Sequence, residues 1–333
     1  MPLVPWWVYL SIRARSFTYF TAANPGIEHS GVFGESKIDI LNKIDQQYLP
    51  KTIFFKADAT PFQVMERLKK ASLPFPIILK PNVGERGNEV AKVDNDTELT
   101  SYLNANDADF IVQEFVDYET ELGILYYRFP NHDETGITSV VAKEFLAVEG
   151  NGASTITELL EQSDRGRFQI ESLRERLGSE MDEILPKGER RNLEPIGNHC
   201  RGTKFLSGMD LINDQLIKVF DQVAKNIDGF YFGRFDLKVS SIADLYQGKN
   251  IKILELNGVT SEAGHIYDPK YSIFKAWYEA GRNMHVMYRV CKENMKNGVK
   301  VTPFFEMLRL VRGHFGNKPE ETAIIAVKPD FQK

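Results

Sequence analysis

The sequence predicts an α+β protein of two or three compact lobes with mixed sheets. Segments with strand and helix patterns follow one another from Lys37 onward, without the regular strand–helix–strand alternation of a parallel α/β fold. The glycine signatures GxGxxG and GxxxxGKS/T are both absent, so Rossmann and P-loop folds lose their main support. A chain of 333 residues is long enough to bury several cores.

Composition and charge narrow the class of protein. Hydrophobic residues make up 42% of the chain and charged residues 26%, as in ordinary soluble proteins. Because 41 basic residues face 46 acidic ones, the net charge is −5, and nucleic acid is not expected as a partner. Cys200 and Cys291 lie far apart without metal-ligand spacing, which suits a reducing, cytoplasmic setting. The sequence leaves a homodimer open.

The first ten residues, MPLVPWWVYL, are apolar and aromatic within an irregular stretch that covers residues 1–36. Arg13 and Arg15 interrupt the apolar run well short of the roughly 20 residues that span a bilayer. A secretory signal would carry its positive charge before the run, and here the charge follows it. We therefore expect a strand or helix packed on the body, with contact to a membrane surface as the alternative and no stable membrane insertion.

Residues 61–115 predict the elements of a first lobe. Thr60 caps a helix with Pro61 in its first turn, and Phe62, Met65 and Leu68 recur at helical spacing. Apolar runs bounded by turn residues predict strands, of which the last is apolar enough to be buried on both faces. The expected elements are a helix at 61–71, strands at 75–80 and 89–93, a helix at 97–103 and a strand at 110–115.

The rest of the chain predicts further strands followed by helices. The best-defined helix covers residues 211–227, where apolar side chains repeat at 3.6-residue spacing. The expected elements are strands at 118–129 and 138–148, helices at 155–162 and 170–177, a loop or extended stretch at 186–202, the helix at 211–227, strands at 230–240 and 252–257 joined by a polar loop, and helices at 275–295 and 303–312.

The most informative stretch is residues 233–258, GRFDLKVSSIADLYQGKNIKILELNG. Alternate residues of a strand share a face, so Arg234, Asp236 and Lys238 point one way and the apolar residues between them point the other. Antiparallel pairing with Ser240 opposite Ile251 would set Asp236 opposite Glu255 and Arg234 opposite Asn257.

Asp236 and Glu255 would repel each other in that register. A divalent cation removes the conflict, since Mg²⁺ takes one or two carboxylates together with substrate phosphates. Arg234 beside them can grip phosphate oxygens with its planar fork of donors. The hairpin therefore suggests a Mg²⁺ site at Asp236, Glu255 and Asn257, with Mn²⁺ as an alternative ion. A solvated hairpin face with ordinary charges is the competing interpretation.

Two upstream segments could bind the rest of a nucleotide. Lys80 ends an apolar strand, and Gly84 and Gly87 follow in a turn whose amides could approach phosphate oxygens. The strand ending in Gln113, Glu114, Phe115 and Val116 could offer main-chain groups to a base, with Glu114 or Glu121 accepting from ribose hydroxyls. For the segment with Lys80, the alternative interpretation is an ordinary hairpin turn. For the segment with Gln113, it is a buried strand followed by an acidic turn.

The order of these pieces, FPIILKP with its glycine loop, then QEFV, then RFD and ELN, resembles the ATP-grasp superfamily. D-alanine–D-alanine ligases and the ATP-grasp part of cyanophycin synthetases are similar over residues 37–291. The resemblance implies two α+β lobes that clasp Mg-ATP, and a ligase that joins a small carboxylate to an amine through an acyl phosphate. It implies a short N-terminal segment at 1–36, lobes at 37–117 and 118–292, and a C-terminal helical extension at 293–333.

The same resemblance implies roles for single residues. Lys80 and an upstream lysine would bind the nucleotide, with Lys37 the best match and Lys43 and Lys56 as competitors. Arg234 would hold phosphate, and the stretch VVAKEF places a second catalytic cation at Lys143. Three residues of the segment LPKGERRNLEPIGNHCRGT would border the acyl-phosphate site: Asn198, Arg201 and Gly202.

Two departures argue against D-alanine–D-alanine activity itself. Only 36 residues precede Lys37, where such ligases carry a sizeable domain, and the segment AGHIYDP replaces their small serine-rich turn. His265 in that segment could touch the acceptor, although a structural role is the simpler interpretation. A phosphotransferase and a non-catalytic ATP-binding module are the alternatives to the ligase.

Overall fold

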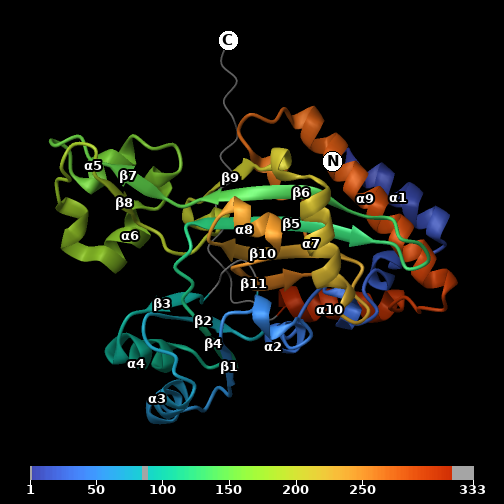
Figure 1. Ribbon diagram of the computed structural model, residues 1–333, viewed down its shortest axis with the longest axis horizontal. Helices are drawn as coiled ribbons and strands as arrows, with labels where there is room; N and C mark the ends of the chain where they lie inside the picture. The colour runs from blue at the N-terminus through green and yellow to red at the C-terminus, as the bar shows by residue number, and fades with distance from the viewer. Residues whose placement is uncertain (1, 85–88, 317–333) are drawn as a thin grey trace.

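Two antiparallel sheets and a small side unit organise the chain in the computed structural model, which describes residues 2–84 and 89–316 (Figure 1). Every strand pair among these residues is antiparallel, so the α+β class is confirmed while the expectation of mixed sheets is wrong. The large sheet contains, in spatial order, β11 (Ile251–Asn257), β10 (Phe232–Val239), β5 (Thr120–Arg128), β6 (Thr135–Glu144) and β9 (Lys204–Ser207).

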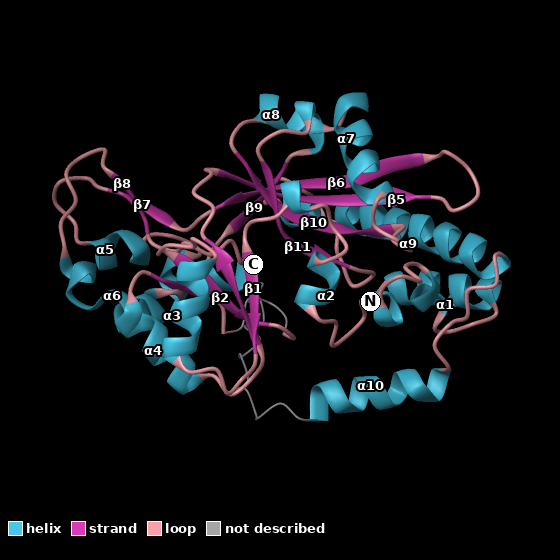
Figure 2. Ribbon diagram, turned by 60° about the horizontal axis from the view of Figure 1, so that its bottom comes forward, coloured by secondary structure: helices cyan, strands magenta, loops and turns pink. Residues whose placement is uncertain are grey.

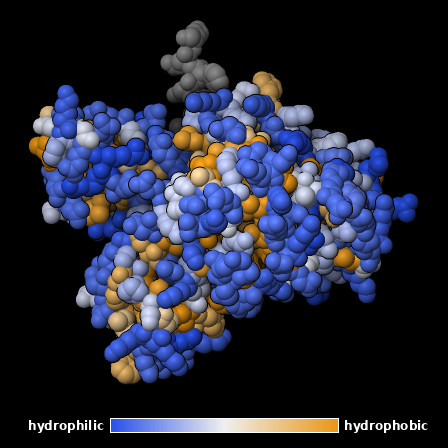
Figure 3. Space-filling model, viewed as in Figure 1, coloured by the Kyte–Doolittle hydropathy of each residue, from blue (hydrophilic) through white to orange (hydrophobic). Residues whose placement is uncertain are grey.

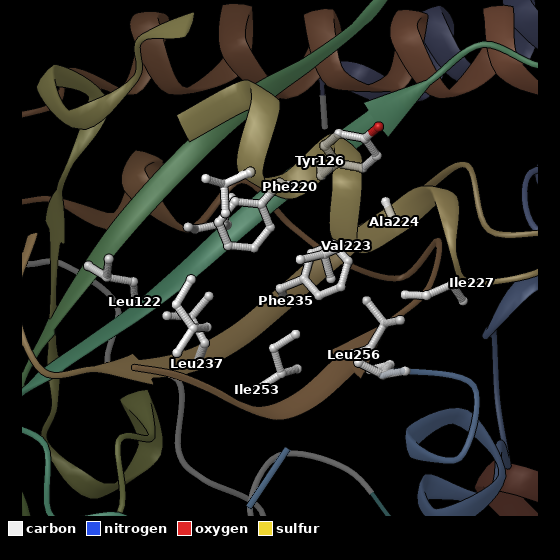
Figure 4. Packing of buried hydrophobic residues seen from close by; sticks show 14 of the residues in the cluster. Leu122, Tyr126, Phe220, Val223, Ala224, Ile227, Phe235, Leu237, Ile253 and Leu256 are labelled. Atoms are coloured by element: carbon white, nitrogen blue, oxygen red, sulfur yellow. The ribbon is translucent and has the colours of Figure 1, made fainter. Parts of the chain in front are cut away.

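One face of the large sheet is covered by helices α7 (Asp214–Lys225) and α8 (Ile242–Gln247). Figure 4 shows Phe235 and Leu237 of β10 directed toward Phe220 and Val223 of α7, and the Phe220 and Phe235 rings lie 5.3 Å apart. Each fully buried side chain of this kind contributes about 1.5–3 kcal/mol of burial free energy. This packing fixes which face of β10 is apolar and therefore which face is free for polar residues.

The opposite face of the large sheet is covered at one end by α1 (Leu3–Ala14) and α9 (Ile273–Lys296) (Figure 2). Leu125 and Phe232 share one hydrophobic core there with residues of both helices. The Trp6 indole donates to the Gly281 carbonyl at 3.1 Å and ties α1 to α9. The remainder of this face, where the charged residues of β10 lie, is turned toward the first lobe.

The first lobe is a four-stranded sheet with two helices on one side. Its central strand β4 is buried along most of its length, as its apolar sequence predicts. The elements are α2 (Lys37–Leu41), which leads into the lobe, then β1 (Thr52–Phe55), α3 (Pro61–Lys70), β2 (Ile77–Pro81), β3 (Ala91–Val93), α4 (Asp96–Ala105) and β4 (Phe110–Glu114).

A side unit with its own small core is inserted between β6 and β9. In the space-filling view this unit and the first lobe project from the same side of the molecule (Figure 3). Its elements are β7 (Ala147–Glu149), α5 (Ile156–Glu161), α6 (Ile170–Leu177) and β8 (Arg190–Asn192).

The loop before α2 is fastened to the start of β10 by buried Asn24. Its side chain accepts from the Tyr231 and Phe232 amides at 2.9 Å each and donates to the Phe232 carbonyl at 2.7 Å. The same loop brings Ser30 within 3.0 Å of the Val259 amide, just after β11. Residues near the N-terminus therefore border the end of the hairpin β10–β11.

Several sequence expectations need correction. Residues 3–14 form a helix packed on the body, as expected for the apolar N-terminal run, so the description of residues 1–36 as irregular is wrong for this part. Pro2 and Pro5 fall at the start of the helix, where main-chain amides need no helical partner. The expected strand at 138–148 is two strands, β6 and β7, and the expected polar loop after β10 contains α8. The last helix among the described residues is α10 (Phe304–Gly316). No helix in the described part is both long and apolar enough to cross a membrane.

Candidate active site

The hairpin β10–β11 brings the predicted metal residues together. Asp236 lies opposite Glu255 and Arg234 opposite Asn257, as expected from strand parity. The expected pairing of Ser240 with Ile251 is wrong, since Val239 takes that place. A β-bulge at Leu254 accounts for the difference, because β11 holds one residue more than β10 between Glu255 and Ile253.

Asp236 is the centre of the charged cluster, which we define as Glu121, Lys143, Arg234, Asp236, Glu255 and Asn257. Arg234 grips both Asp236 oxygens, with Nε 2.8 Å from Oδ1 and Nη2 3.0 Å from Oδ2. The Asn257 amide donates to Oδ2 at 3.3 Å. Burial alone would raise the pKa of the Asp236 carboxyl, but the Arg234 and Lys143 charges outweigh burial and hold the pKa below its usual value.

Lys143 of β6 joins the cluster through Glu121 of β5. Its Nζ lies 2.8 Å from Glu121 Oε1 and 3.9 Å from Asp236 Oδ2. Both side chains of the Lys143–Glu121 pair are less than a tenth exposed. Burial by itself would lower the pKa of Lys143, yet the carboxylates of Asp236 and Glu121 raise it above its ordinary value. Lys143 is therefore a fixed cation beside Asp236.

Two lysines reach the same place from outside the large sheet. Lys80, 7% exposed on β2, donates to Gln113 Oε1 and to the Leu254 carbonyl, each at 3.0 Å. Burial lowers the pKa of Lys80 to about 8, although Glu255 nearby acts to raise it. Lys37 at the start of α2 donates to the Gly84 carbonyl at 2.5 Å, and its Nζ lies 3.9 Å from Glu255 Oε1.

Lys37 is thus the upstream lysine that lies at the cluster. Of its two competitors, Lys56 is paired with Asp109 at 2.8 Å, away from the charged cluster, and Lys43 is an exposed residue that follows α2. Gly84, in the loop after β2, has a φ of 158° and offers its carbonyl to Lys37. Gly87 lies outside the described residues.

The predicted hinge strand connects the two lobes. Gln113 is buried between Lys80 and Thr52, and Glu114 Oε2 accepts from the Lys51 amide at 3.0 Å. Phe115 and Val116 follow β4 directly and lead into β5. Of the two candidates for a ribose acid, Glu121 belongs to the charged cluster and Glu114 lies at the end of β4.

The segment with Asn198 and Arg201 borders β3. Arg201 Nη2 donates to the Val90 carbonyl at 3.0 Å, and its Nη1 lies 3.4 Å from Glu194 Oε1. Asn198 Oδ1 accepts from the Cys200 amide at 2.8 Å, which caps a short turn that ends at Gly202 with a φ of 86°. These residues therefore connect the side unit to the first lobe.

His265 has a structural place. It is fully buried, and its Nδ1 lies 2.7 Å from the Ser139 hydroxyl. Burial lowers the pKa of its imidazole, which favours the neutral form. Because it is fully buried, the His265 side chain cannot contact a substrate group in this conformation.

Three residues at the site were not singled out from the sequence. A Cβ on Gly123 would lie 3.0 Å from Asp236 Oδ1, and one on Gly197 would lie 2.5 Å from Glu121 Oε1. Lys238 is 8% exposed and donates to the Val116 carbonyl at 3.1 Å. Burial lowers the pKa of Lys238. For Lys238, the sequence indicated only that it shares a strand face with Asp236. No local sequence pattern marks Gly123 or Gly197.

The donor set fits a hard divalent cation that also binds phosphate. Asp236, Glu255 and Asn257 supply oxygen atoms from one face of the hairpin, and Mg²⁺ commonly takes only one or two carboxylates from protein. In the described residues no group of three or more His, Cys, Asp or Glu side chains forms a metal site. Two carboxylates and an amide thus suit an ion whose remaining ligands are phosphate and water.

The chain is similar in sequence to part of a known protein. No protein-family model matches the chain. It is 27% identical over 212 residues to the cyanophycin synthetase of Geminocystis herdmanii, a match that covers 58% of this chain and 24% of that protein. The chain thus matches about a quarter of the length of this curated relative.

Solved ligase structures are also similar to the chain, at low identity. They are the VanG D-Ala:D-Ser ligase from Enterococcus faecalis (14% identity, TM-score 0.43, 79% of this chain and 60% of that one) and the D-alanine–D-alanine ligase from Bacillus anthracis (13%, 0.46, 79% and 69%). The resemblance to part of cyanophycin synthetase that the sequence suggested is confirmed by the sequence match.

Proposed function

We propose that the chain is an ATP-dependent carboxylate–amine ligase of the ATP-grasp type, with Mg-ATP bound between the first lobe and the large sheet. One observation carries the proposal: four cations and three oxygen ligands, drawn from α2, β2, β6, β10 and β11, converge on one place. The separation of these residues along the chain makes a chance surface cluster a poor explanation. The similarity to part of a cyanophycin synthetase supports the same reaction class.

The four cations would interact with different parts of the phosphate chain. Lys37 and Lys80 approach from the side of the first lobe and would hold the outer phosphates. Lys143 and Arg234 are held by carboxylates on the large sheet and would stabilise charge on the group in transfer. The site residues therefore position the γ-phosphoryl group between the nucleotide and a substrate carboxylate.

Asp236, Glu255 and Asn257 would hold Mg²⁺. When bound, the ion neutralises phosphate charge. Arg234 and Asn257 both donate to Asp236 Oδ2, whereas Oδ1, which accepts from Arg234 Nε, has a second lone pair for another partner.

The reaction would join two small molecules. Transfer of the γ-phosphoryl group to a carboxylate gives an acyl phosphate and ADP, and attack by an amine gives an amide and releases phosphate. No side-chain nucleophile is needed for either step. We propose small carboxylate and amine substrates, bound near the segment of Asn198 and Arg201, whose Gly197 lies against Glu121 of the cluster, with lobes divided near residues 117 and 118.

ADP release measured against a panel of amino acids and small carboxylates tests the proposal. We expect turnover only when a carboxylate and an amine are both present, with one amide formed for each ADP. Turnover without any amine, giving a stable phosphorylated compound, would instead indicate a phosphotransferase. Binding of Mg-ATP without turnover on any pair would indicate a non-catalytic module.

A further inference from the structure

Lys238 is a buried lysine between the lobes that the proposed phosphoryl transfer does not use. It follows Asp236 by two residues on β10 and lies opposite Glu121 of β5. Its Nζ is 5.5 Å from the centre of the Phe115 ring, 5.3 Å from that of Phe145, and 3.1 Å from the Val116 carbonyl. Among the described residues it makes no ion pair within 4.0 Å, unlike Lys143 on β6, which pairs with Glu121.

A buried ammonium with one neutral acceptor is poorly compensated. Burial of a charge costs free energy unless hydrogen bonds or counter-charges replace water. An ammonium has three donors, and the Val116 carbonyl takes one of them. Two aromatic rings contribute favourable cation–π contacts but accept no conventional hydrogen bond. Lys238 therefore has donors available for a ligand that enters beside these rings.

The position of Lys238 fits the base of a nucleotide. Lys37, Lys80 and Arg234 define the phosphate end, and Lys238 lies farther along the same strand face at the connection between the lobes. Aromatic side chains stack on bases, and main-chain groups read base edges. Phe115, Phe145 and the Val116 carbonyl supply both kinds of group.

Purines differ in what they present to such a site. Position 6 of adenine carries an amine donor, whereas position 6 of guanine carries a carbonyl acceptor. The Val116 carbonyl alone would suit the amine. Lys238 donates to this carbonyl and adds donors beside it, which suit a 6-oxo group instead.

We propose that Lys238 is a specificity-determining residue for the nucleobase, and that it extends the nucleotide range from ATP to 6-oxo purine triphosphates. The proposal rests on the proposed function, since it places the base at Phe115 and Val116 while the phosphates lie at Lys37 and Lys80. It concerns recognition only and changes no step of the reaction.

Titration of Mg-ATP and Mg-ITP into the wild-type protein by calorimetry tests the proposal without a substitution. ITP carries a 6-oxo group where ATP carries the amine. We expect ITP to bind at least as tightly as ATP. Wild-type protein that binds ATP more than about tenfold tighter than ITP overturns the role of Lys238.

Lys238→Met then tests the residue itself, with Lys249→Met as the control because Lys249 is an exposed lysine of the same hairpin. The ratio of ITP to ATP affinity should fall at least about tenfold in Lys238→Met and stay at the wild-type value in Lys249→Met. An unchanged ratio in Lys238→Met overturns the inference but leaves the nucleotide site standing. Wild-type protein that binds neither nucleotide overturns the proposed function as well.

Discussion

The Lys80 ammonium donates to the Leu254 carbonyl at 3.0 Å, and this bond joins the two lobes at the site. Leu254 is the extra residue of the β-bulge, so it has no partner on β10. Its carbonyl can therefore accept from a lysine on the other lobe. The bulge adjacent to Glu255 thus contributes to the site by anchoring Lys80, in addition to setting the register of the hairpin.

Replacing Lys80 by methionine should weaken nucleotide binding while the fold persists. A hydrogen bond to a charged group contributes about 1.5–3 kcal/mol, so Mg-ATP affinity should fall about 10- to 100-fold. Calorimetry on Lys80→Met measures this change. Lys252→Met is a matched control, because Lys252 also donates to a main-chain carbonyl, that of Leu49 at 2.9 Å, but lies outside the charged cluster. Equal losses in both variants would contradict a specific role for Lys80.

Nucleotide affinity should fall as pH rises through about 8. Burial lowers the pKa of Lys80 to about 8 in the free protein, so the side chain is charged below that pH and loses its charge above it. Phosphate attraction therefore weakens between about pH 8 and 9.5, by at most about tenfold per pH unit. Titrations at several pH values should show this decline in the wild-type protein and a flatter profile in Lys80→Met. Parallel profiles would contradict the assignment.

Loss of Lys143 should destabilise the protein through Glu121. The Glu121 carboxylate is buried and depends on Lys143, 2.8 Å away. Breaking a buried ion pair by removing one partner costs about 3–5 kcal/mol, so Lys143→Met should lower the free energy of unfolding by that order. Urea denaturation measures it. Glu121→Gln in the same chain should restore part of the loss, and strictly additive effects would show that the two residues are not coupled.

Gly123→Ala should damage the site more than the fold. The new Cβ would lie 2.8 Å from Val141 Cγ1, 3.0 Å from Asp236 Oδ1 and 3.2 Å from Arg234 Cδ, so the Asp236–Arg234 pair has to shift. Overpacking costs about 1–3 kcal/mol of stability, while Mg-ATP binding should be lost more severely because the displaced groups are the ones proposed to bind phosphate and metal. Gly313→Ala on α10, with no atom within 4 Å of the new Cβ, is the control. Wild-type affinity in Gly123→Ala would be inconsistent with this geometry.

Much of the site could be predicted because β10 must bury one face. Phe235 and Leu237 pack against α7, so period-two alternation alone places Asp236 and Arg234 on the other face. The pairing of Asp236 with Glu255 follows from that alternation and from the hairpin. The bulge at Leu254 could not be predicted, because the extra residue has no distinctive chemistry of its own.

Tertiary contacts explain the other differences. The N-terminal apolar run is compatible with a strand or a helix, and the helix that residues 3–14 form packs along α9, which is distant in sequence. Gly123 and Gly197 matter only because Asp236 and Glu121 lie against them in space. The roles assigned to all the site residues, including Arg201, Asn198 and the ribose acids, stay predictions, since they depend on where nucleotide, metal and substrates bind.

Calorimetry of ATP binding with and without Mg²⁺, in the wild-type protein and in Glu255→Gln, tests the central claim most directly. Glu255→Gln keeps the size of the side chain and removes the charge opposite Asp236. We expect Mg²⁺ to increase wild-type affinity and most of that increase to disappear in Glu255→Gln, a loss of about 10- to 100-fold, while exposed Glu119→Gln behaves as wild type. Wild-type binding that is indifferent to Mg²⁺, or Glu255→Gln that binds Mg-ATP as tightly as wild type, would contradict a Mg-nucleotide site at this hairpin.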